Sequence, residues 1–135
     1  MSTDTGGYRQ IGQVAERSEL SLKTIRHYDE VGLVQPSARS TGGFRLYTAA
    51  DVERLLVIRR MKPLGFTLAE RKQLLDAVDV LDDQTATAQQ RSAARVDLLA
   101  FRDKARDRAE RLRQQLANAE EFTDLLTART CAPSA

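Results

Sequence analysis

The feature that most constrains this chain is a stretch without glycine or proline that runs from Gln89 to Thr127. Within it, residues 105, 109, 112, 116, 119, 123 and 126 are Ala, Ala, Leu, Leu, Ala, Thr and Leu, at alternating intervals of four and three. Leu98 extends the pattern backwards, although residue 102 is arginine. Such spacing is typical of a heptad repeat, so we predict one continuous coiled-coil helix over residues 89–127.

A helix of that length, roughly 58 Å at 1.5 Å per residue, cannot bury its apolar stripe within a chain of 135 residues. We therefore expect it to pair with its copy in a homodimer. An antiparallel hairpin within the chain is the alternative, and it is disfavoured because no turn signal interrupts the segment. The predicted dimerisation residues are Leu98, Ala105, Ala109, Leu112, Leu116, Ala119 and Leu126.

The composition favours small helical units over one large aromatic core, because only 5% of the residues are aromatic and 30% are charged. The net charge of +2 is divided unevenly. Residues 1–75 contain 12 Lys and Arg against 8 Asp and Glu, whereas residues 76–135 contain 9 against 11. The positive excess favours an anionic partner such as nucleic acid, although ordinary surface charge would look the same.

Two short helices are predicted near the N-terminus. Ile11, Val14 and Ala15 have the spacing of an amphipathic helix. Ser21 is a favourable N-cap for a second helix, and Gly32 suits the left-handed residue that ends it. Two helices joined by a turn of a few residues form a helix-turn-helix pattern.

A small β-hairpin, or wing, is predicted to follow. Pro36 cannot continue a helix, and Thr-Gly-Gly at residues 41–43 suits a tight turn. Phe44 and Leu46 then alternate with Arg45 and Tyr47, which predicts a strand with one buried face. Arg45 and Tyr47 are expected to point together to the other side.

Two further helices are predicted from their N-terminal caps. Thr48 with Asp51, and Thr67 with Glu70, have the spacing of capping boxes, and Pro63 separates the two helices. The predicted organisation is a disordered N-terminus at 1–7, a winged helix-turn-helix domain at 8–78, a linker at 79–88, the coiled-coil helix at 89–127 and a flexible tail at 128–135.

The helix that begins after Ser21 can present one polar face. A rotation of 100° per residue turns Leu22 and Ile25 toward the core. Donors and aromatic hydroxyls on the opposite face suit a helix that enters a DNA groove, although a solvated polar surface would have the same composition. The side chains on that opposite arc are Lys23, Thr24, His27 and Tyr28.

Catalytic and metal sites are not indicated. One histidine, His27, and one cysteine, Cys131, cannot supply a nucleophile with its base and orienting group, or a zinc site within one chain. We expect no enzyme activity, no cofactor and no metal. A single cysteine suits a reducing compartment, and no apolar run approaches membrane-spanning length, so a cytoplasmic location is expected.

Two motifs carry a family resemblance. "TIRHYDEVGL" (24–33) and "FRLYTAADVERL" (44–55), together with the long helix, resemble the MerR family of bacterial transcription regulators. The resemblance covers residues 8–75 at the level of motifs and the long helix by pattern. It implies a mainly α fold, with a winged helix-turn-helix domain and an antiparallel coiled-coil dimer.

The resemblance also implies a function and its residues. Such regulators bind a pseudo-palindromic promoter site as homodimers and distort the spacer DNA so that RNA polymerase can use both promoter elements. Lys23 and Thr24 are expected nearest the base edges. The full set of predicted DNA-binding residues is Arg17, Ser21, Lys23, Thr24, Arg26, His27, Tyr28, Arg45 and Tyr47.

Several departures from the family pattern stand out. Glu19 occupies a turn position where glycine is common, and Pro63 and Arg71 replace a helix former and an apolar residue. We expect a short member without a C-terminal effector domain, whose effector is unknown. Two other functions remain open: a DNA-architectural, excisionase-like factor, and a coiled-coil module whose winged helix binds protein.

Overall fold

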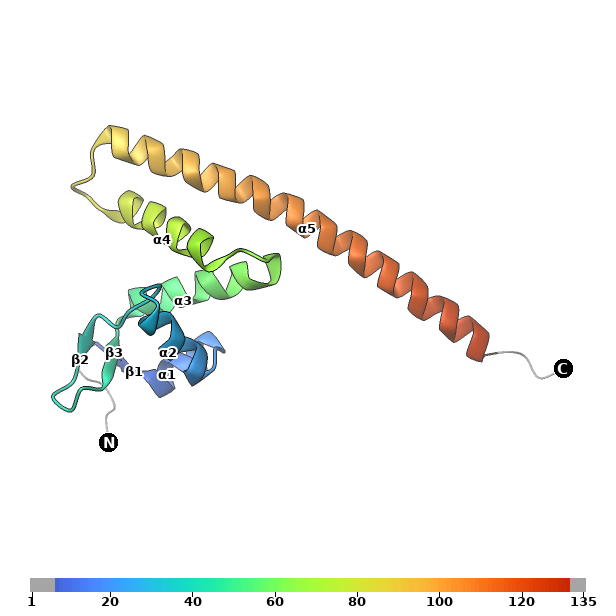
Figure 1. The fold of residues 1–135 in the computed structure, drawn as a ribbon, viewed down its shortest axis with the longest axis horizontal. Coiled ribbons are helices and arrows are strands. Elements are labelled where there is room, and N and C mark those ends of the chain that lie inside the picture. The colour runs from blue at the N-terminus through green and yellow to red at the C-terminus, as the bar shows by residue number, and fades with distance from the viewer. Residues whose placement is uncertain (1–6, 132–135) are drawn as a thin grey trace.

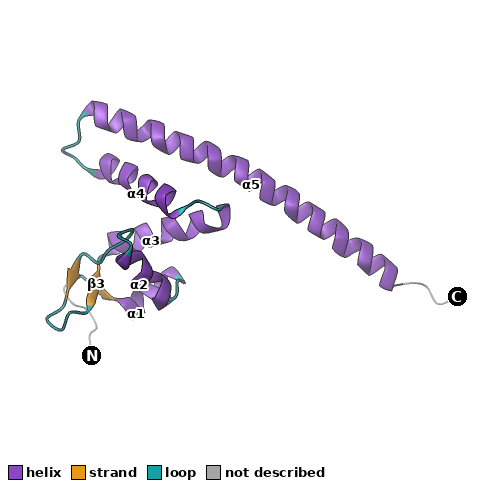
Figure 2. Ribbon diagram, viewed as in Figure 1, coloured by secondary structure: helices purple, strands orange, loops and turns teal. Residues whose placement is uncertain are grey.

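The computed structural model describes residues 7–131, which form two parts of different shape (Figure 1). A small unit of short helices and strands occupies the N-terminal side, and one long helix extends away from it. Helices dominate, and the strands lie in one small sheet (Figure 2). The helices are α1 (Ile11–Ser18), α2 (Leu22–Glu30), α3 (Ala49–Met61), the 3-10 helix η1 (Lys62–Leu64), α4 (Leu68–Asp82) and α5 (Ala88–Thr130).

The predicted hairpin is present and is part of a three-stranded antiparallel sheet of order β1-β3-β2. Strands β2 (Ala38–Arg39) and β3 (Arg45–Tyr47) are the two arms of the wing. The sequence pattern did not predict the third strand, β1 (Arg9–Gln10), which pairs with β3 just before α1. This pairing attaches the wing to the first helix.

Side-chain caps define the helix starts, as the sequence predicts. The Thr24 amide donates to Ser21 Oγ at 3.0 Å, and capping boxes join Thr48 with Asp51 and Thr67 with Glu70. Each cap satisfies backbone N–H groups that have no partner within the helix. Helix α3 ends at Met61 in front of Pro63, also as expected.

One apolar core holds the N-terminal unit together. Its fully buried residues come from α1, α2, β3, α3 and α4 and include Val14, Ile25, Tyr47, Leu55 and Leu75. A second cluster of Met61, Phe66 and Phe101 joins this unit to the first half of α5. The Phe66 and Phe101 rings meet edge to face, with centroids 5.8 Å apart.

The boundaries of the predicted linker and tail need correction. Helix α4 continues through residues 79–82, so the turn to α5 spans only Asp83 to Thr87, where the predicted linker began at residue 79. The Thr85 amide and hydroxyl both donate to the Asp83 carboxylate and stabilise this turn. Residues 128–130, predicted as tail, are helical, and most of the predicted N-terminal and C-terminal flexible segments lie outside the described residues.

Helix α5 is continuous over 43 residues, about 64 Å. Its first half lies alongside α4 (Figure 1), and there Leu98 and Ala105 are partly covered by their own chain. The chain's own partial cover leaves both residues beside an open pocket, so their place in the dimer seam stays a prediction. From residue 110 to residue 130, however, every side chain of α5 is exposed.

Candidate nucleic-acid interface

The turn between α1 and α2 places the second helix on the surface. Glu19 adopts a left-handed conformation, with φ of 58°, in the position where the family resemblance suggests glycine. Its carboxylate is ion-paired with Arg59 of α3. A non-glycine residue rarely adopts this conformation because it strains the backbone. The ion pair with Arg59 is therefore made by a residue whose backbone is strained.

Helix α2 presents three cationic or ionisable side chains to solvent. Lys23, Arg26 and His27 are exposed, and Ser21 and Arg17 are exposed beside them. Thr24 is partly buried, and its hydroxyl lies 2.8 Å from Ser21 Oγ. All six of these predicted contact residues are therefore at least partly accessible to solvent.

Tyr28 does not belong to that face. Its side chain is only 3% exposed, and its hydroxyl accepts a hydrogen bond from Arg71 Nη1 at 3.1 Å. The prediction was wrong because the buried side of α2 is centred on Ile25 and Tyr28, whereas Leu22, predicted to face the core, is 39% exposed. Arg71 also extends its guanidinium over the Tyr28 ring, 5.9 Å from the ring centre.

The wing is attached to α2 by a charge network. The buried carboxylate of Asp29 accepts hydrogen bonds from Arg39 Nη2 at 3.0 Å and from Arg45 Nε at 2.6 Å. The hydrogen bond that Arg45 donates to Asp29, supported by the negative charge of that carboxylate, raises the pKa of the Arg45 guanidinium. Because Arg39 stays half exposed, the network both holds the wing and leaves cationic groups beside α2.

Tyr47 is the second predicted contact that the structure places in the core. It is fully buried, and burial raises the pKa of its phenol. Leu46 is buried as well, while Phe44 is 70% exposed at the wing tip, so β3 does not follow the expected alternation. Strands β1 and β2 pair along the two edges of β3, and helices α1 and α3 pack against it. Tyr47 is therefore not available to DNA.

Two cationic residues that were not predicted lie on the other side of α2. Lys62, at the start of η1, and Arg71 of α4 line a concavity of about 350 Å³ with Lys23, Thr24 and His27. None of the described residues that line it is acidic. Sequence spacing could not identify this cluster, because residues 62 and 71 are distant from α2 in the chain.

The described residues of this surface provide positive charge and hydrogen-bond donors. Among residues 7–131, no three His, Cys, Asp or Glu side chains are grouped as a metal site. None of the helices in this range is both long and apolar enough to cross a bilayer. The site can hold an extended anion along α2, with the wing on one side and the η1 corner on the other.

A helix-turn-helix with an exposed second helix, an adjacent hairpin and surrounding cations defines the winged helix-turn-helix class of nucleic-acid-binding folds. The family model described as MerR HTH family regulatory protein matches residues 9–78. The chain belongs to the MerR HTH family of regulatory proteins.

Individual relatives agree with this assignment. The chain is 39% identical over 100 residues to the HTH-type transcriptional regulator HmrR of Rhizobium leguminosarum bv. viciae, covering 74% of this chain and 75% of that protein. It is 49% identical over 67 residues to the HTH-type transcriptional activator mta of Bacillus subtilis, covering 50% of this chain and 26% of that protein. The chain thus spans about a quarter of mta and three quarters of HmrR.

A solved structure extends the similarity to the long helix. The N-terminal part of the Bacillus subtilis multidrug transporter activator, MtaN, superposes with a TM-score of 0.51 and 29% identity. The match covers 92% of this chain and 99% of that one. A helix-turn-helix unit followed by a long helix is therefore shared along almost the whole chain.

Proposed function

We propose that this chain is a transcription regulator that binds double-stranded promoter DNA as a homodimer, within the cytoplasm. The observation that carries the proposal is the position of Lys23, Arg26 and His27 on one exposed face of α2. The wing arginines lie on one side of this face, and Lys62 and Arg71 lie on the other. An HTH protein places its second helix in the major groove, with flanking cations on the phosphates.

The flanking cations support binding to a deformed duplex. The wing network and the η1 corner lie on opposite sides of α2, so both can contact backbone outside the groove that α2 enters. Contacts spread along the DNA phosphate backbone favour a duplex that bends toward them. The protein then recognises the deformability of the DNA as well as its base edges. By family resemblance, this distortion adjusts a promoter spacer for RNA polymerase.

Removal of one cation from α2 tests the proposal. We expect Lys23→Ala to weaken binding to the cognate promoter by about 1–3 kcal/mol if Lys23 contacts a base edge. A phosphate contact instead would weaken binding to all sequences and lower the slope of log affinity against log salt by about one. Fluorescence anisotropy with labelled duplexes over a salt series distinguishes the two.

The matched control is Arg111→Ala, which removes one positive charge from an exposed site on α5 whose partner is Asp107. This variant should retain the affinity and the salt slope of the wild type. If Lys23→Ala bound as tightly as Arg111→Ala at moderate salt, α2 would not be the DNA-reading helix and the proposed function would fail.

A further inference from the structure

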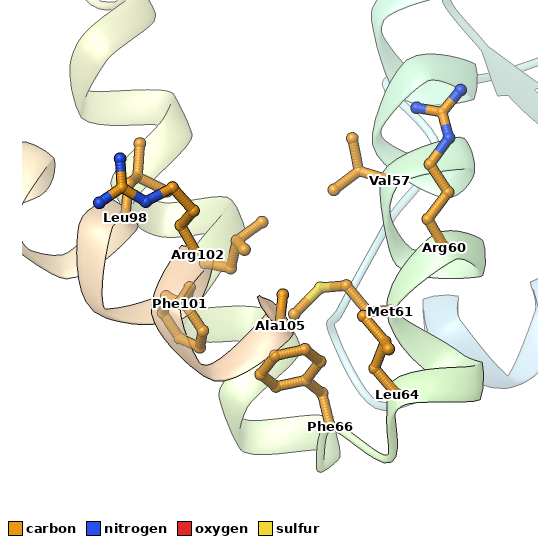
Figure 3. A pocket seen from close by; sticks show the side chains of 10 residues that line it. Val57, Arg60, Met61, Leu64, Phe66, Leu98, Phe101, Arg102 and Ala105 are labelled. Atoms are coloured by element: carbon orange, nitrogen blue, oxygen red, sulfur yellow. The ribbon is translucent and has the colours of Figure 1, made fainter. Parts of the chain in front are cut away.

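The η1 corner, residues 62–66, joins α3 to α4 and lies against the first half of α5. It contains the short helix η1 and then Gly65, whose left-handed conformation, with φ of 74°, turns the chain. Figure 3 shows Leu64 and Phe66 of this corner beside a pocket of about 330 Å³ that Phe101 of α5 also lines. Phe66 is buried against Phe101, so the corner is packed on the long helix.

Arg108 of α5 contacts both this corner and the helix that follows it. Its Nη1 donates to the Leu64 carbonyl at 3.2 Å, and its guanidinium lies 4.4 Å from the centre of the Phe66 ring. Its Nη2 lies 4.0 Å from the Glu70 carboxylate of α4, which also accepts a hydrogen bond from Lys104 Nζ at 3.4 Å. A planar guanidinium can bind a carbonyl, an aromatic face and a carboxylate at once, whereas a lysine ammonium cannot.

Arg71 of α4 continues the contact from the corner to α2. Its Nε donates to the Phe66 carbonyl at 3.3 Å, and its Nη1 donates to the Tyr28 hydroxyl at 3.1 Å. The carbonyls on the two sides of Gly65 therefore each accept a hydrogen bond from an arginine. A continuous series of contacts thus runs from Arg108 of α5, through Phe66 and Arg71, to Tyr28 of α2.

The position of Lys62 connects this corner with the proposed DNA site. Lys62 begins η1, is exposed, and lines the concavity beside α2 with Lys23 and His27. Within the corner, the Gly65 amide donates to the Lys62 carbonyl at 3.0 Å. A 3-10 turn of three residues is marginal by itself, so contacts from outside the turn determine where Lys62 lies.

From these contacts we infer that Arg108 is a positioning residue for DNA binding, which fixes the η1 corner on α5 and thereby holds Lys62 beside α2, at the height of a backbone phosphate. The inference rests on the proposed function, in which Lys62 contacts the DNA backbone. Arg108 does not itself bind DNA in this arrangement, because its guanidinium contacts Leu64, Phe66 and Glu70. The placement of the long helix is thereby linked to DNA affinity through contacts within one chain.

Arg108→Lys tests this role, because it keeps the charge and removes the planar guanidinium. Loss of one phosphate contact should weaken DNA binding about fivefold at about 0.15 M salt and lower the slope of log affinity against log salt by about one. Lys62→Ala should show the same two changes, and the double variant should lose no more than either single variant. Fluorescence anisotropy over a salt series measures these values, with a labelled duplex that the protein has selected from a random-sequence pool.

The matched control is Arg111→Lys, which makes the same replacement at an exposed arginine of α5. This variant should keep the wild-type affinity and salt slope. All variants should also keep the wild-type circular dichroism spectrum and sedimentation coefficient, so that a loss of affinity is not a loss of fold.

Hydrogen exchange in the DNA-free protein tests the same contact independently of DNA binding. In Arg108→Lys, the amides of residues 62–66 should exchange at least about threefold faster than in the wild type or in Arg111→Lys, because the corner opens more often. Mass spectrometry of peptides that cover the corner measures the rates.

The outcomes separate this inference from the proposed function. Equal exchange at the corner in Arg108→Lys and Arg111→Lys would overturn the inference, whether or not the protein bound DNA. Faster exchange with an unchanged salt slope, or a loss that added to that of Lys62→Ala, would overturn it too, because Arg108 would then stabilise the corner without positioning Lys62. A wild-type protein that selected no duplex would refute the proposed function and, with it, the role of Arg108 in DNA binding.

Discussion

The two ends of this molecule contain similar apolar residues in opposite surroundings. In the N-terminal unit, Leu55 and Ile58 are fully buried among residues of four other elements. In the second half of α5, Leu112 and Leu116 project into solvent. Local ion pairs such as Arg113 with Glu110 add only about 0.3–0.5 kcal/mol each to such a helix. The first region thus buries its apolar side chains within its own chain, whereas the second leaves them exposed.

The largest effect is expected from disruption of the predicted dimer contact. Leu112→Asp with Leu116→Asp places two charges in the predicted seam, and we expect dimer dissociation to increase more than about 100-fold, because each unpaired charge would be desolvated. Analytical ultracentrifugation should give the monomer mass. Ala117→Asp adds a charge on the outward side of α5 and should leave the mass of the dimer unchanged. An unaltered mass in the double variant would refute the seam.

A truncation repeated in both regions compares them directly. Leu55→Ala should lower the free energy of unfolding by about 2–5 kcal/mol, because it leaves a cavity in the core. Leu125→Ala, made at a residue that is 55% exposed, should change it by less than about 0.5 kcal/mol. Urea denaturation followed by circular dichroism measures both. Equal losses would mean that α5 is covered in solution at residue 125 as well.

Ion pairs in the two regions should also differ. Asp29 is buried and holds two wing arginines, so Asp29→Asn should cost about 1–3 kcal/mol. Asp107 is exposed beside Arg111, and Asp107→Asn should cost less than about 1 kcal/mol. Thermal unfolding of both variants gives the values. A cost for Asp29→Asn no greater than that for Asp107→Asn would mean that the wing is held by its strand pairing alone.

The smallest effect concerns the buried phenol of Tyr47. Among the described residues, its hydroxyl has no hydrogen-bond partner. Tyr47→Phe removes this buried polar group and keeps the ring, so we expect stability to stay equal or to rise by up to about 1 kcal/mol. DNA affinity should not change. A loss of DNA affinity with unchanged stability would restore Tyr47 as a contact residue and contradict its placement in the core.

Much of the local structure follows from short-range chemistry. A Ser or Thr that accepts a hydrogen bond from an amide three residues later defines the start of α2, α3 and α4, and these starts were predicted correctly. Pro63 and Gly32 mark helix ends for equally local reasons. The linker boundary was wrong because the apolar side of α4 continues through Val80 and Leu81, which the acidic residues around them obscured.

The candidate site was predicted less completely than the helices. Arg17, Lys23, Arg26 and His27 are exposed as expected, whereas Tyr28 and Tyr47 are buried. A helical wheel gives the angle between residues correctly, but it does not say which direction is covered. The covered side of α2 depends on where α1, α3 and α4 pack. A small error in the predicted orientation of α2 therefore assigns a buried residue such as Tyr28 to the surface.

The sequence by itself determined the helix-turn-helix, the wing and the long helix, because caps, turns and heptad spacing act between residues close together in the chain. Tertiary structure alone decided which side of α2 is free, and it brought Lys62 and Arg71 to Lys23 and joined Asp29 to both wing arginines. It also divided α5 into a first half that its own chain covers on one side and a second half that it leaves exposed. These outcomes depend on contacts between distant residues, and burial is a property of the packed chain as a whole.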